Sequence, residues 1–429
     1  MKVIMIEESD GKIKIQGWVE NVRDLGGLAF IDLRDINGRY QVTALKGSEF
    51  ITIARSLKPE SVIEVIGHRK ENPKASNGYE IIPEKIEIMT TSEQPVPLNL
   101  NKNVQSSLDK ELDYRFLSLR KPKTAAIFKV QSTISNGVSR FFEEMGFYQI
   151  HSSKIVSQAT EGGANVFSVV YFDRTAYLAQ SPQFYKQMMM AAGFEKVFEV
   201  GPVFRAEPHH TTRHLTEYTS IDIEMSFIKS YEDIMGVMEQ LMVRLYEDVS
   251  RNNAKELELY GIKLEPPKTP FPRIAMAEAA KILQSYGRKL KEDGDIDPEG
   301  ERILGAYIKE KFGSDFFFLT EFPWSAAQFY HMRKDGNPSV TCRADLIFKG
   351  LEITTLAQRE HRYDILVKQL GEKGLDAEKF GFYLDFFRYG VPPHGGSGTG
   401  LERIVKQLLG LENVAEATLL PRTPDRLTP

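Results

Sequence analysis

Five short stretches near the start of the chain alternate apolar and polar residues with a period of two. They are KIKIQGWVENV (12–22), LAFIDLRD (28–35), YQVTAL (40–45), SVIEVIGHRKE (61–71) and YEIIPEKIEIM (79–89). Alternation of this kind is typical of half-buried strands, and turn-forming residues separate the stretches. Five strands in such a short span predict a small Greek-key barrel of the OB type over residues 1–91.

The pattern changes after residue 91. Residues 92–120 begin with the aperiodic, proline-containing SEQPVPLNLNKN and are predicted to be a linker. Residues 125–145 place apolar side chains at three- and four-residue spacings and predict an amphipathic helix that ends near Gly146. A strand-like FYQIHSSKI follows it.

Strands and helices then alternate to the end of the chain. Helices are expected at 231–251, 358–373 and 399–409, and strands at 175–180, 196–207, 218–228, 315–322, 339–354 and 382–390. Such a mixture predicts an α+β domain over residues 121–429, built on a mixed, mainly antiparallel sheet flanked by helices.

Composition narrows the class of protein. With 429 residues, of which 41% are hydrophobic, the chain can bury the cores of two or three domains. The single cysteine, Cys342, excludes an intramolecular disulfide and a thiolate zinc cluster. No apolar run approaches the roughly 18 residues of a membrane span, and no signal peptide is recognisable, so we expect a cytoplasmic protein without a membrane partner.

A net charge of −4 gives no general support for nucleic-acid binding, so such a partner must be argued from motifs. A nucleotide site must likewise be found without a glycine fingerprint. The only Gly-Lys pair, Gly11-Lys12, is followed by Ile13, and G-x-G-x-x-G does not occur. Phosphate binding would therefore use cationic side chains.

The first cation-bearing segment is GPVFRAEPHHTTRHLTEYTSIDIEM (201–225). Two-residue spacing on a strand places Arg205 and Glu207 on one face, and a following loop carries Arg213 and His214. A surface hairpin with an Arg–Glu ion pair is the alternative. Zinc binding by its histidines is disfavoured because no acid or thiolate lies at ligand spacing.

Two later segments carry similar chemistry. YGVPPHGGSGTGLERIVKQLLG (389–410) has glycines that allow close backbone approach, followed by Arg403 in the first turn of a helix. CRADLIFKGLEITTLAQREHRYD (342–364) contains Asp345 and Glu352, acids able to hold magnesium against phosphates. Taken alone, each is equally compatible with a helix-capping turn or a solvated hairpin.

Residues 201–225 and 389–410 resemble the second and third signature motifs of class II aminoacyl-tRNA synthetases, F-R-x-E and G-x-G-x-x-R. Residues 342–364 resemble the segment of the same family that binds ATP, Mg²⁺ and the amino acid. Residues 13–429 resemble the aspartyl-tRNA synthetases of the archaeal/eukaryotic type. The most discriminating stretches are ATEGGANVF (159–167) and YLAQSPQFYKQMMM (177–190). SRFFEEMGFYQIHSSKI (139–155) resembles the remaining motif, which implies a homodimer. It departs from the family at Ser153, where members carry proline.

The resemblance implies that ATP is a substrate, with Mg²⁺, and that Arg205 and Arg403 are catalytic. Arg205 would contact the α-phosphate and the substrate carboxylate, while Arg403 would lie across the adenine and γ-phosphate. The implied ATP-binding set is Arg205, Glu207, Arg213, His214, Leu215, Glu352, Gly400 and Arg403. The implied metal ligands are Asp345, Glu352 and Thr355.

An aspartate pocket must pair a buried carboxylate with cations, because an unpaired buried charge costs several kcal/mol. The implied aspartate-binding set is Glu161, Gln183, Lys186, Arg205, Thr355 and Arg359, with Asp222 as a weaker candidate for the substrate ammonium. Asparaginyl relatives typically have an acid at the position of Lys186. The alternative is that Gln183 and Lys186 line an exposed helix. Leu356 and Ala357 depart from the usual Gly-Gly, and bulkier residues there would narrow the pocket.

In the barrel, Arg23, Phe30 and Gln41 match anticodon-binding positions of the family, with Phe30 as a stacking platform. The alternative for Phe30 is a core residue. Archaeal members restricted to tRNA-Asp tend to have Trp and Lys where this chain has Glu20 and Ser76. Their absence predicts a non-discriminating enzyme that also charges tRNA-Asn.

The sequence therefore predicts an aspartate–tRNA ligase that activates L-aspartate with ATP and transfers it to tRNA-Asp. An asparaginyl-tRNA synthetase is the nearest alternative. A tRNA-independent ligase is disfavoured because such paralogues usually lack the barrel domain. A regulatory protein with a decayed synthetase body is disfavoured because the five main catalytic positions are present: Arg205, Glu207, Glu352, Arg359 and Arg403.

Overall fold

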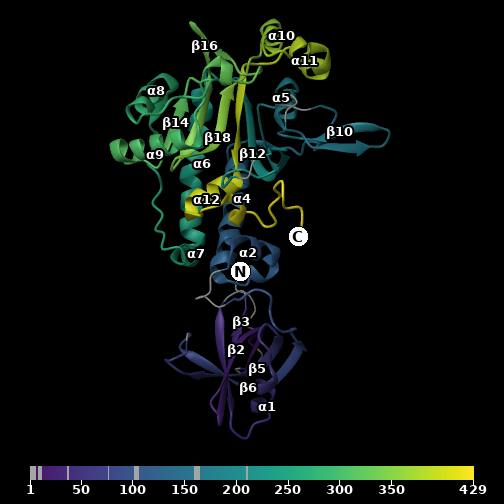
Figure 1. Ribbon diagram of the computed structural model, residues 1–429, viewed down its shortest axis with the longest axis vertical. Helices are drawn as coiled ribbons and strands as arrows, with labels where there is room; N and C mark the ends of the chain where they lie inside the picture. The colour runs from purple at the N-terminus through teal and green to yellow at the C-terminus, as the bar shows by residue number, and fades with distance from the viewer. Residues whose placement is uncertain are drawn as a thin grey trace. The chain divides into compact units, whose positions relative to one another are not determined.

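The computed structural model describes residues 6–7, 12–35, 38–75, 77–100, 106–158, 165–208 and 211–429. Their contacts divide the chain into two compact units, Met1–Ser106 and Ser107–Pro429, the first drawn in purple and blue in Figure 1. No helix among the described residues is long and apolar enough to cross a membrane.

The first unit is a closed barrel. Its strands are β1 (Ile6–Glu7), β2 (Lys12–Asp24), β3 (Leu28–Arg34), β4 (Arg39–Leu45), β5 (Val62–Glu71) and β6 (Tyr79–Thr90), with helix α1 (Phe50–Ser56) between β4 and β5. They follow the order β1-β2-β3-β4-β6-β5, and β5 also pairs with β2. All five predicted strands and the OB-type fold are confirmed, because alternate side chains fill one core.

The second unit begins at Ser107, inside the range 92–120 that was expected to be a linker. Within the range 92–120, residues 108–113 and 115–118 form helices α2 (Leu108–Asp113) and α3 (Arg115–Ser118). The buried guanidinium of Arg115 donates to the carbonyl oxygens of Glu416, Thr418 and Leu419 at 2.8–3.1 Å. These bonds fix residues 107–120 to the end of the chain.

An eight-stranded sheet forms the centre of this unit, in the order β13-β14-β17-β18-β19-β12-β11-β7. The pairs β13–β14 and β11–β7 are parallel and the other pairs antiparallel, which confirms the mixed, mainly antiparallel sheet. The strands are β7 (Tyr148–Gln149), β11 (Lys196–Phe204), β12 (Glu217–Ser226), β13 (Arg273–Ala275), β14 (Phe316–Thr320), β17 (Arg343–Phe348), β18 (Leu351–Gln358) and β19 (His394–Gly400).

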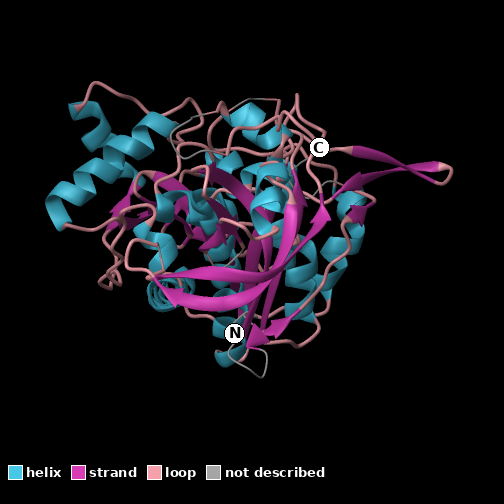
Figure 2. Ribbon diagram, turned by 90° about the horizontal axis from the view of Figure 1, so that it is seen from below, coloured by secondary structure: helices cyan, strands magenta, loops and turns pink. Residues whose placement is uncertain are grey.

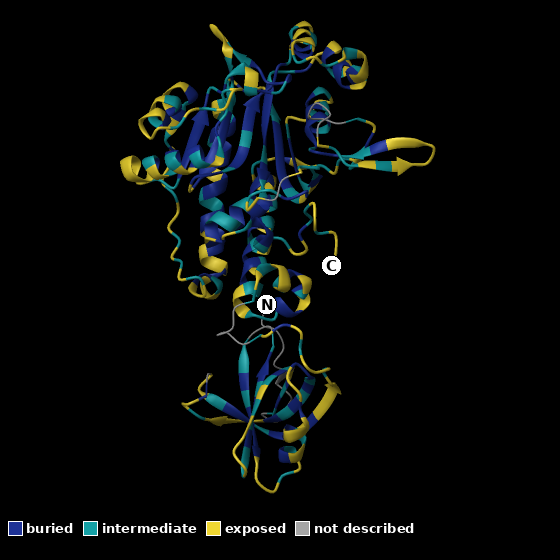
Figure 3. Cartoon of the chain, viewed as in Figure 1, coloured by how far each residue is buried: buried dark blue, intermediate teal, exposed yellow. Residues whose placement is uncertain are grey.

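Helices cover the two faces of the sheet unequally. One face packs continuously on α4 (Pro122–Glu144), α6 (Tyr231–Asn252) and α12 (Leu401–Leu409). On the other face, α8 (Met276–Ser285) and α9 (Pro298–Phe312) cover one end, while α5 (Gln183–Ala191), α10 (Tyr363–Glu372) and α11 (Gly381–Arg388) cover the other. The strands of this sheet are largely buried (Figure 3). The middle strands β18, β19 and β12 thus stay open to a cavity on the second face.

Smaller elements complete the unit. They are α7 (Ala254–Glu258), the sheet of β8 (Ile155–Val156), β9 (Ser168–Tyr171) and β10 (Arg174–Leu178), the pair β15 (Arg333–Lys334) and β16 (Asn337–Thr341), and the 3-10 helices Trp324–Ala326, Ala377–Phe380 and Val414–Ala417. The β9–β10 hairpin projects from the second unit in both views (Figures 1 and 2).

The strand predicted at 382–390 is wrong, because these residues form helix α11. Its buried side chains are Tyr383, Leu384 and Phe387, spaced for one face of a helix, whereas its aromatic composition is typical of strands. The helices expected from residues 358 and 399 begin later, at Tyr363 and Leu401: Gln358 still belongs to β18 and is followed by four non-helical residues, and residues 399–400 belong to β19. The helices α1, α8 and α9 were not predicted.

Strand β19 owes its central position to glycine. A Cβ atom at Gly396 would lie 2.0 Å from the Ile223 carbonyl oxygen and 2.2 Å from Oε2 of Glu224. The missing side chain therefore makes room for a carboxylate that projects from the neighbouring strand.

Candidate active site

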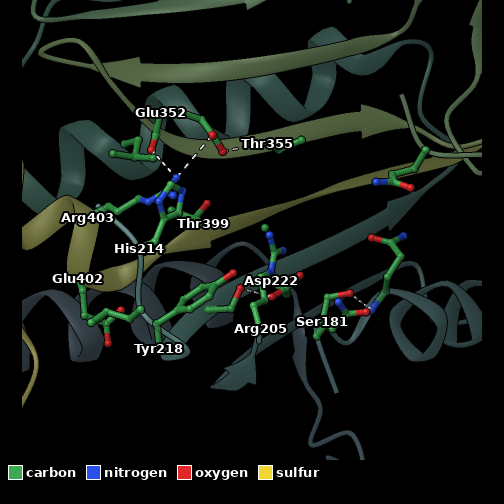
Figure 4. Close-up of a pocket in the computed structure, with 18 of the residues that line it drawn as sticks. Ser181, Arg205, His214, Tyr218, Asp222, Glu352, Thr355, Thr399, Glu402 and Arg403 are labelled. Carbon is green, nitrogen blue, oxygen red and sulfur yellow. Dashed lines mark hydrogen bonds and ion pairs between the residues drawn. The ribbon is translucent and has the colours of Figure 1, made fainter. Parts of the chain in front are cut away.

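A cavity of about 310 Å³ lies over β12, β18 and β19 (Figure 4). Most predicted site residues line it: Gln183, Lys186, Arg205, Glu207, Arg213, His214, Leu215, Glu352, Thr355, Arg359, Gly400 and Arg403. Asp345 is not among the lining residues. Glu161 lies outside the described residues.

Lys186 lies at one end of the cavity and is only 2% exposed. Its Nζ donates to Oδ1 of Asp222 and to the Ser397 carbonyl oxygen, both at 2.9 Å. Gln183, one turn earlier on α5, is also buried. The alternative that these residues line an exposed helix is therefore wrong.

Arg359 completes the same end of the cavity. Its Nε and Nη2 donate to the two carboxylate oxygens of Glu224 at 3.0 and 3.3 Å, so neither bond uses Nη1. Glu224 is fully buried and also lies 3.5 Å from Lys186 Nζ. Glu224 therefore contacts both cations. It was not among the residues predicted from the sequence.

The charges at this end are balanced within the protein. Two cations, Lys186 and Arg359, face two acids, Asp222 and Glu224, and all four side chains are at least 95% buried. Removing one member would leave a buried charge unpaired, at a cost of several kcal/mol. Lys186 and Arg359 are therefore held in fixed positions against the cavity.

The other end of the cavity carries cations suited to phosphate. The Arg205 guanidinium lies 5.8 Å from the Tyr218 ring centroid, and Nδ1 of His214 is 2.7 Å from the Thr211 hydroxyl. Burial, followed by the charge of Arg403, lowers the pKa of His214, so its imidazole is neutral near pH 7.

Arg403, in the first turn of α12, contacts strand β18 at this end. Its Nη1 donates to the Glu352 carbonyl oxygen at 2.9 Å and lies 3.5 Å from the Glu352 carboxylate (Figure 4). Burial alone would raise the pKa of Glu352, but Arg403, Arg343 and Arg213 together hold it at about 2. The carboxylate is therefore ionised at any working pH.

A bulge in β18 brings Glu352 and Thr355 to the same face. Thr354 pairs with Leu346 and Glu352 with Ile347, so Ile353 is an extra residue without a partner in the register. The Thr355 hydroxyl then donates to Oε1 of Glu352 at 3.1 Å. Without the bulge, two side chains three residues apart on one strand would face opposite sides of the sheet.

Asp345 behaves differently from the expected metal ligand. Both of its carboxylate oxygens accept bonds from Arg343, at 3.2 and 2.7 Å. Burial raises the pKa of Asp345 to about 7, although Arg343 opposes the shift. Among the described residues, no group of three His, Cys, Asp or Glu side chains could hold a metal ion. The other two histidines of the predicted loop, residues 209 and 210, lie outside the described residues.

The two departures from the family pattern lie away from the cavity. Leu356 is fully buried in the core on the opposite face of the sheet, and neither it nor Ala357 lines the cavity. The expected narrowing of the pocket by Leu356 is therefore wrong. Ser153 is exposed between β7 and β8.

The first unit brings its three predicted residues onto one face. Arg23 pairs with Phe30 across β2 and β3, and its guanidinium lies 5.2 Å from the ring centroid. Its Nη2 also donates to Asp32 at 3.1 Å and to Gln41 at 3.3 Å. Phe30 is half-buried and outside the barrel core, so its interpretation as a core residue is wrong.

Glu80 extends this face and was missed by the sequence analysis. Its Oε2 accepts from the Thr43 hydroxyl at 2.6 Å and from the Gln41 amide at 3.4 Å. Burial would raise the pKa of Glu80, but the bonds from Thr43 and Asn72 and the charge of Lys70 lower it overall. The polar face thus carries an ionised acid beside the stacking ring.

Glu20 lies within an ion-pair network of the barrel. Its carboxylate accepts from Arg34 at 3.2 Å and from Arg39 at 2.8 Å, and Arg34 also donates to Glu60 at 2.8 Å. Glu20 therefore holds two arginines of neighbouring strands. Ser76, the second predicted discrimination position, lies outside the described residues.

Comparisons with known proteins agree with this geometry. The family described as tRNA synthetases class II (D, K and N) matches residues 107–424, and the OB-fold nucleic acid binding domain matches residues 13–89. An aspartate–tRNA(Asp/Asn) ligase of Aeropyrum pernix is 48% identical, over 98% of this chain and 96% of its own length. An aspartate–tRNA(Asp) ligase of Thermococcus kodakarensis is also 48% identical, over 99% and 98%.

A solved structure is similar over nearly the whole chain. The asparaginyl-tRNA synthetase of Pyrococcus horikoshii, complexed with asparaginyl-adenylate, superposes with a TM-score of 0.90 at 34% identity, over 97% of this chain and 96% of its own. The chain therefore belongs to the class II tRNA synthetases (D, K and N). The sequence resemblance to the aspartyl members is confirmed by the 48%-identical relatives.

Proposed function

We propose that the protein is an aspartate–tRNA ligase, which activates L-aspartate with ATP and transfers it to tRNA. The observation that carries the amino-acid assignment is the buried pair of Lys186 and Arg359 at one end of the cavity. Nζ of Lys186 is fixed against the cavity by Asp222 and the Ser397 carbonyl oxygen, and Nη1 of Arg359 takes no part in the bonds to Glu224. A side-chain carboxylate pairs with such cations better than an amide does. Gln183, and Glu161 from the preceding segment, are assigned to the α-amino end.

ATP binds at the other end of the cavity in this proposal. Glu207 contacts the adenine, Arg205 the α-phosphate, and Arg213 and His214 the terminal phosphates, with Leu215 and Gly400 along the cavity wall. The α-carboxylate of aspartate is already a nucleophile, so the first step needs no general base. It attacks the α-phosphorus, the bond from that phosphorus to the oxygen of the β-phosphate breaks, and pyrophosphate leaves with the electron pair, which gives the aspartyl-adenylate. Arg205 and Arg403 stabilise the charge that develops on the phosphates.

A magnesium ion fits the residues present. The carboxylate of Glu352 and the hydroxyl of Thr355 supply oxygen ligands, which Mg²⁺ prefers, and they lie 3.1 Å apart. When bound there, the ion would neutralise phosphate charge. Asp345 is occupied by Arg343, so Glu352 and Thr355 are the primary ligands in this proposal, with Asp345 in support.

Aspartate-dependent exchange of pyrophosphate into ATP tests the activation step. We expect exchange with L-aspartate and at least a hundredfold less with L-asparagine, because the amide cannot satisfy two cationic donors. Preference for asparagine would overturn the assignment in favour of an asparaginyl enzyme. Absence of tRNA charging despite normal exchange would favour the tRNA-independent ligase.

We further propose that the enzyme charges both tRNA-Asp and tRNA-Asn. The relatives at 48% identity are named as ligases for tRNA(Asp/Asn) and for tRNA(Asp), so identity does not separate the two specificities. The supporting observation is that Glu20 offers a carboxylate bound by Arg34 and Arg39 rather than an aromatic surface. Charging of purified tRNA-Asp and tRNA-Asn in parallel tests it.

A homodimer is the proposed assembly. Strand β7 ends the sheet, and its Tyr148 is exposed and packs edge-to-face on Phe194, with the ring centroids 5.5 Å apart. The projecting β9–β10 hairpin exposes Val170 and Phe172. An apolar sheet edge of this kind favours pairing with a second copy. Tyr148→Asp should give a monomer in sedimentation analysis; the cytoplasmic location stays a prediction.

A further inference from the structure

Glu301 lies on α9, an element that the sequence analysis did not predict, and none of the assigned roles includes it. It is 8% exposed, and its partners Arg213 and Glu352 both line the cavity. Both carboxylate oxygens accept from Nη2 of Arg213, at 2.8 and 2.9 Å. The backbone N–H of Glu352 donates to the same carboxylate at 2.9 Å.

These contacts close a ring of four residues. Arg403 donates from Nε to the Arg213 carbonyl oxygen at 3.3 Å and from Nη1 to the Glu352 carbonyl oxygen at 2.9 Å. Glu301 joins the same two partners, Arg213 and Glu352, from the other side. A single carboxylate therefore fixes the loop after β11 relative to β18, and both segments carry assigned ATP-binding residues.

The position of Glu301 is itself fixed by close packing. A Cβ atom at Gly305 would lie 2.7 Å from Cα of Gly350, at the turn between β17 and β18. Leu304 and Ile308 bury the same helix against β14 and β17. Since the helix backbone touches the hairpin, Glu301 cannot move away from Glu352 without breaking this contact.

Only one terminal nitrogen of Arg213 bonds to Glu301. Its Nε is buried and has no hydrogen-bond partner among the described residues. The guanidinium is thus held by Nη2, and Nη1 takes no part in the bonds to Glu301.

We propose that Glu301 is a positioning residue for ATP, which holds the Arg213 guanidinium in the orientation that receives the terminal phosphates. This inference rests on the proposed function. It assigns to α9 a role in nucleotide affinity, with no contact to the amino acid.

The test compares Glu301→Gln with Glu310→Gln, an exposed acid on the same helix. Calorimetry with ATP and Mg²⁺ should give about a tenfold weaker Kd for Glu301→Gln and an unchanged value for Glu310→Gln. In pyrophosphate exchange the KM for ATP should rise equally, while the KM for aspartate stays within twofold. A tighter Kd would overturn the proposal, because Glu301 would then compete with the phosphates.

A double-mutant cycle separates positioning from structural support. In an Arg213→Ala background, Glu301→Gln should have almost no further effect on the ATP Kd. Full additivity of the two changes would overturn the proposal. If the wild-type chain shows no aspartate-dependent exchange, the proposed function is refuted. ATP calorimetry would still decide the role of Glu301 in that case.

Discussion

The cavity of the second unit and the polar face of the barrel each combine an arginine, a carboxylate and an aromatic ring, but in different surroundings. In the cavity, Arg359 binds Glu224 and lies 5.6 Å from the Tyr330 ring centroid. On the barrel, Arg23 binds Asp32 and lies 5.2 Å from the Phe30 ring centroid. The Arg359 side chain is 4% exposed and that of Arg23 is 50% exposed.

This difference in burial separates their tasks. A buried ion pair must be complete, because losing one partner costs about 3–5 kcal/mol, so the cavity distinguishes ligands by charge. An exposed pair is worth about 0–1 kcal/mol, so the barrel must recognise its ligand by stacking and shape. Charge changes should therefore have large effects in the cavity and small effects on the barrel.

The largest effect is expected from Lys186→Glu. It places a third acid beside Asp222 and Glu224, so aspartate-dependent pyrophosphate exchange should fall by at least 1,000-fold, about 4 kcal/mol. Circular dichroism checks folding, and Lys186→Gln, which adds no charge, provides a second variant if the first is unfolded. Exchange within tenfold of wild type in either variant would contradict the aspartate assignment.

Arg205→Ala and Arg403→Ala should each lower the activation rate by about 100- to 1,000-fold, since both cations act on developing phosphate charge. Single-turnover formation of the adenylate measures this rate. Arg23→Ala on the barrel serves as the matched control and should leave it unchanged. Full activity in either cavity variant would place the phosphates elsewhere.

Glu402 gives a pH-dependent contrast with Glu80. Burial raises the pKa of Glu402 to about 7, and its carboxylate accepts from the Thr219 backbone N–H at 3.1 Å. The folded state therefore binds more protons than the unfolded state between roughly pH 4.5 and 7, and the contribution of Glu402 to stability is lost as pH rises through 7. Glu402→Gln should remove this loss. Compared with wild type, the substitution should raise the free energy of unfolding of the second unit by about 3 kcal/mol more at pH 8 than at pH 4.5.

Fluorescence resolves this prediction because each unit contains one tryptophan, Trp18 or Trp324. Unfolding of the second unit is followed by Trp324 in a Trp18→Phe background, and unfolding of the barrel by Trp18 in a Trp324→Phe background, at both pH values. Glu80, whose pKa is lowered, should show the opposite sign: Glu80→Gln destabilises the barrel at pH 8, and the effect is lost as pH falls. Equal pH profiles for wild type and Glu402→Gln would refute the first part.

Phe30→Ala should weaken charging through tRNA affinity alone. Loss of one base-stacking surface costs about 1–3 kcal/mol, so the KM for tRNA should rise roughly tenfold. Pyrophosphate exchange without tRNA should be unaffected, since Phe30 belongs to the other unit. A parallel fall in exchange would show that the ring supports folding rather than recognition.

The smallest difference is expected between the two tRNAs. Aspartylation of tRNA-Asp and tRNA-Asn should agree within about tenfold, or 1.4 kcal/mol. The double variant Glu20→Trp/Ser76→Lys should depress charging of tRNA-Asn selectively. Glu20→Trp also removes the bonds from Arg34 and Arg39, which could damage the barrel. Ser76→Lys alone keeps those bonds and is therefore the control. Equal losses on both tRNAs would contradict a role in base discrimination.

Local patterns sufficed for the barrel, whereas the predicted residues that line the cavity came from the resemblance of motifs to a known family. Period-two alternation identified β2 to β6 because each strand has one face in the core. The same criterion failed at α11, whose aromatic residues resemble a strand although they are buried at helical spacing. Propensity alone could not arbitrate there.

Partners brought together from distant segments were not predictable. Glu224 is 135 residues from Arg359, and Glu301 is 88 residues from Arg213, so no spacing rule connects them. The bulge at Ile353, which turns Glu352 and Thr355 to one face, is likewise set by pairing with β17. Such features depend on strand register, which a single sequence leaves open.

The glycine strand β19 has a consequence for mutational tolerance. Even alanine at position 396 would collide with the Glu224 carboxylate, which anchors Arg359. A saturation screen scored by growth would therefore rank Gly396 with the substrate-contacting arginines, although it has no side chain to offer a ligand. The boundary of the functional site, drawn by tolerance, would include a glycine of β19 that does not line the cavity, beside Gly400 of the same strand, which does.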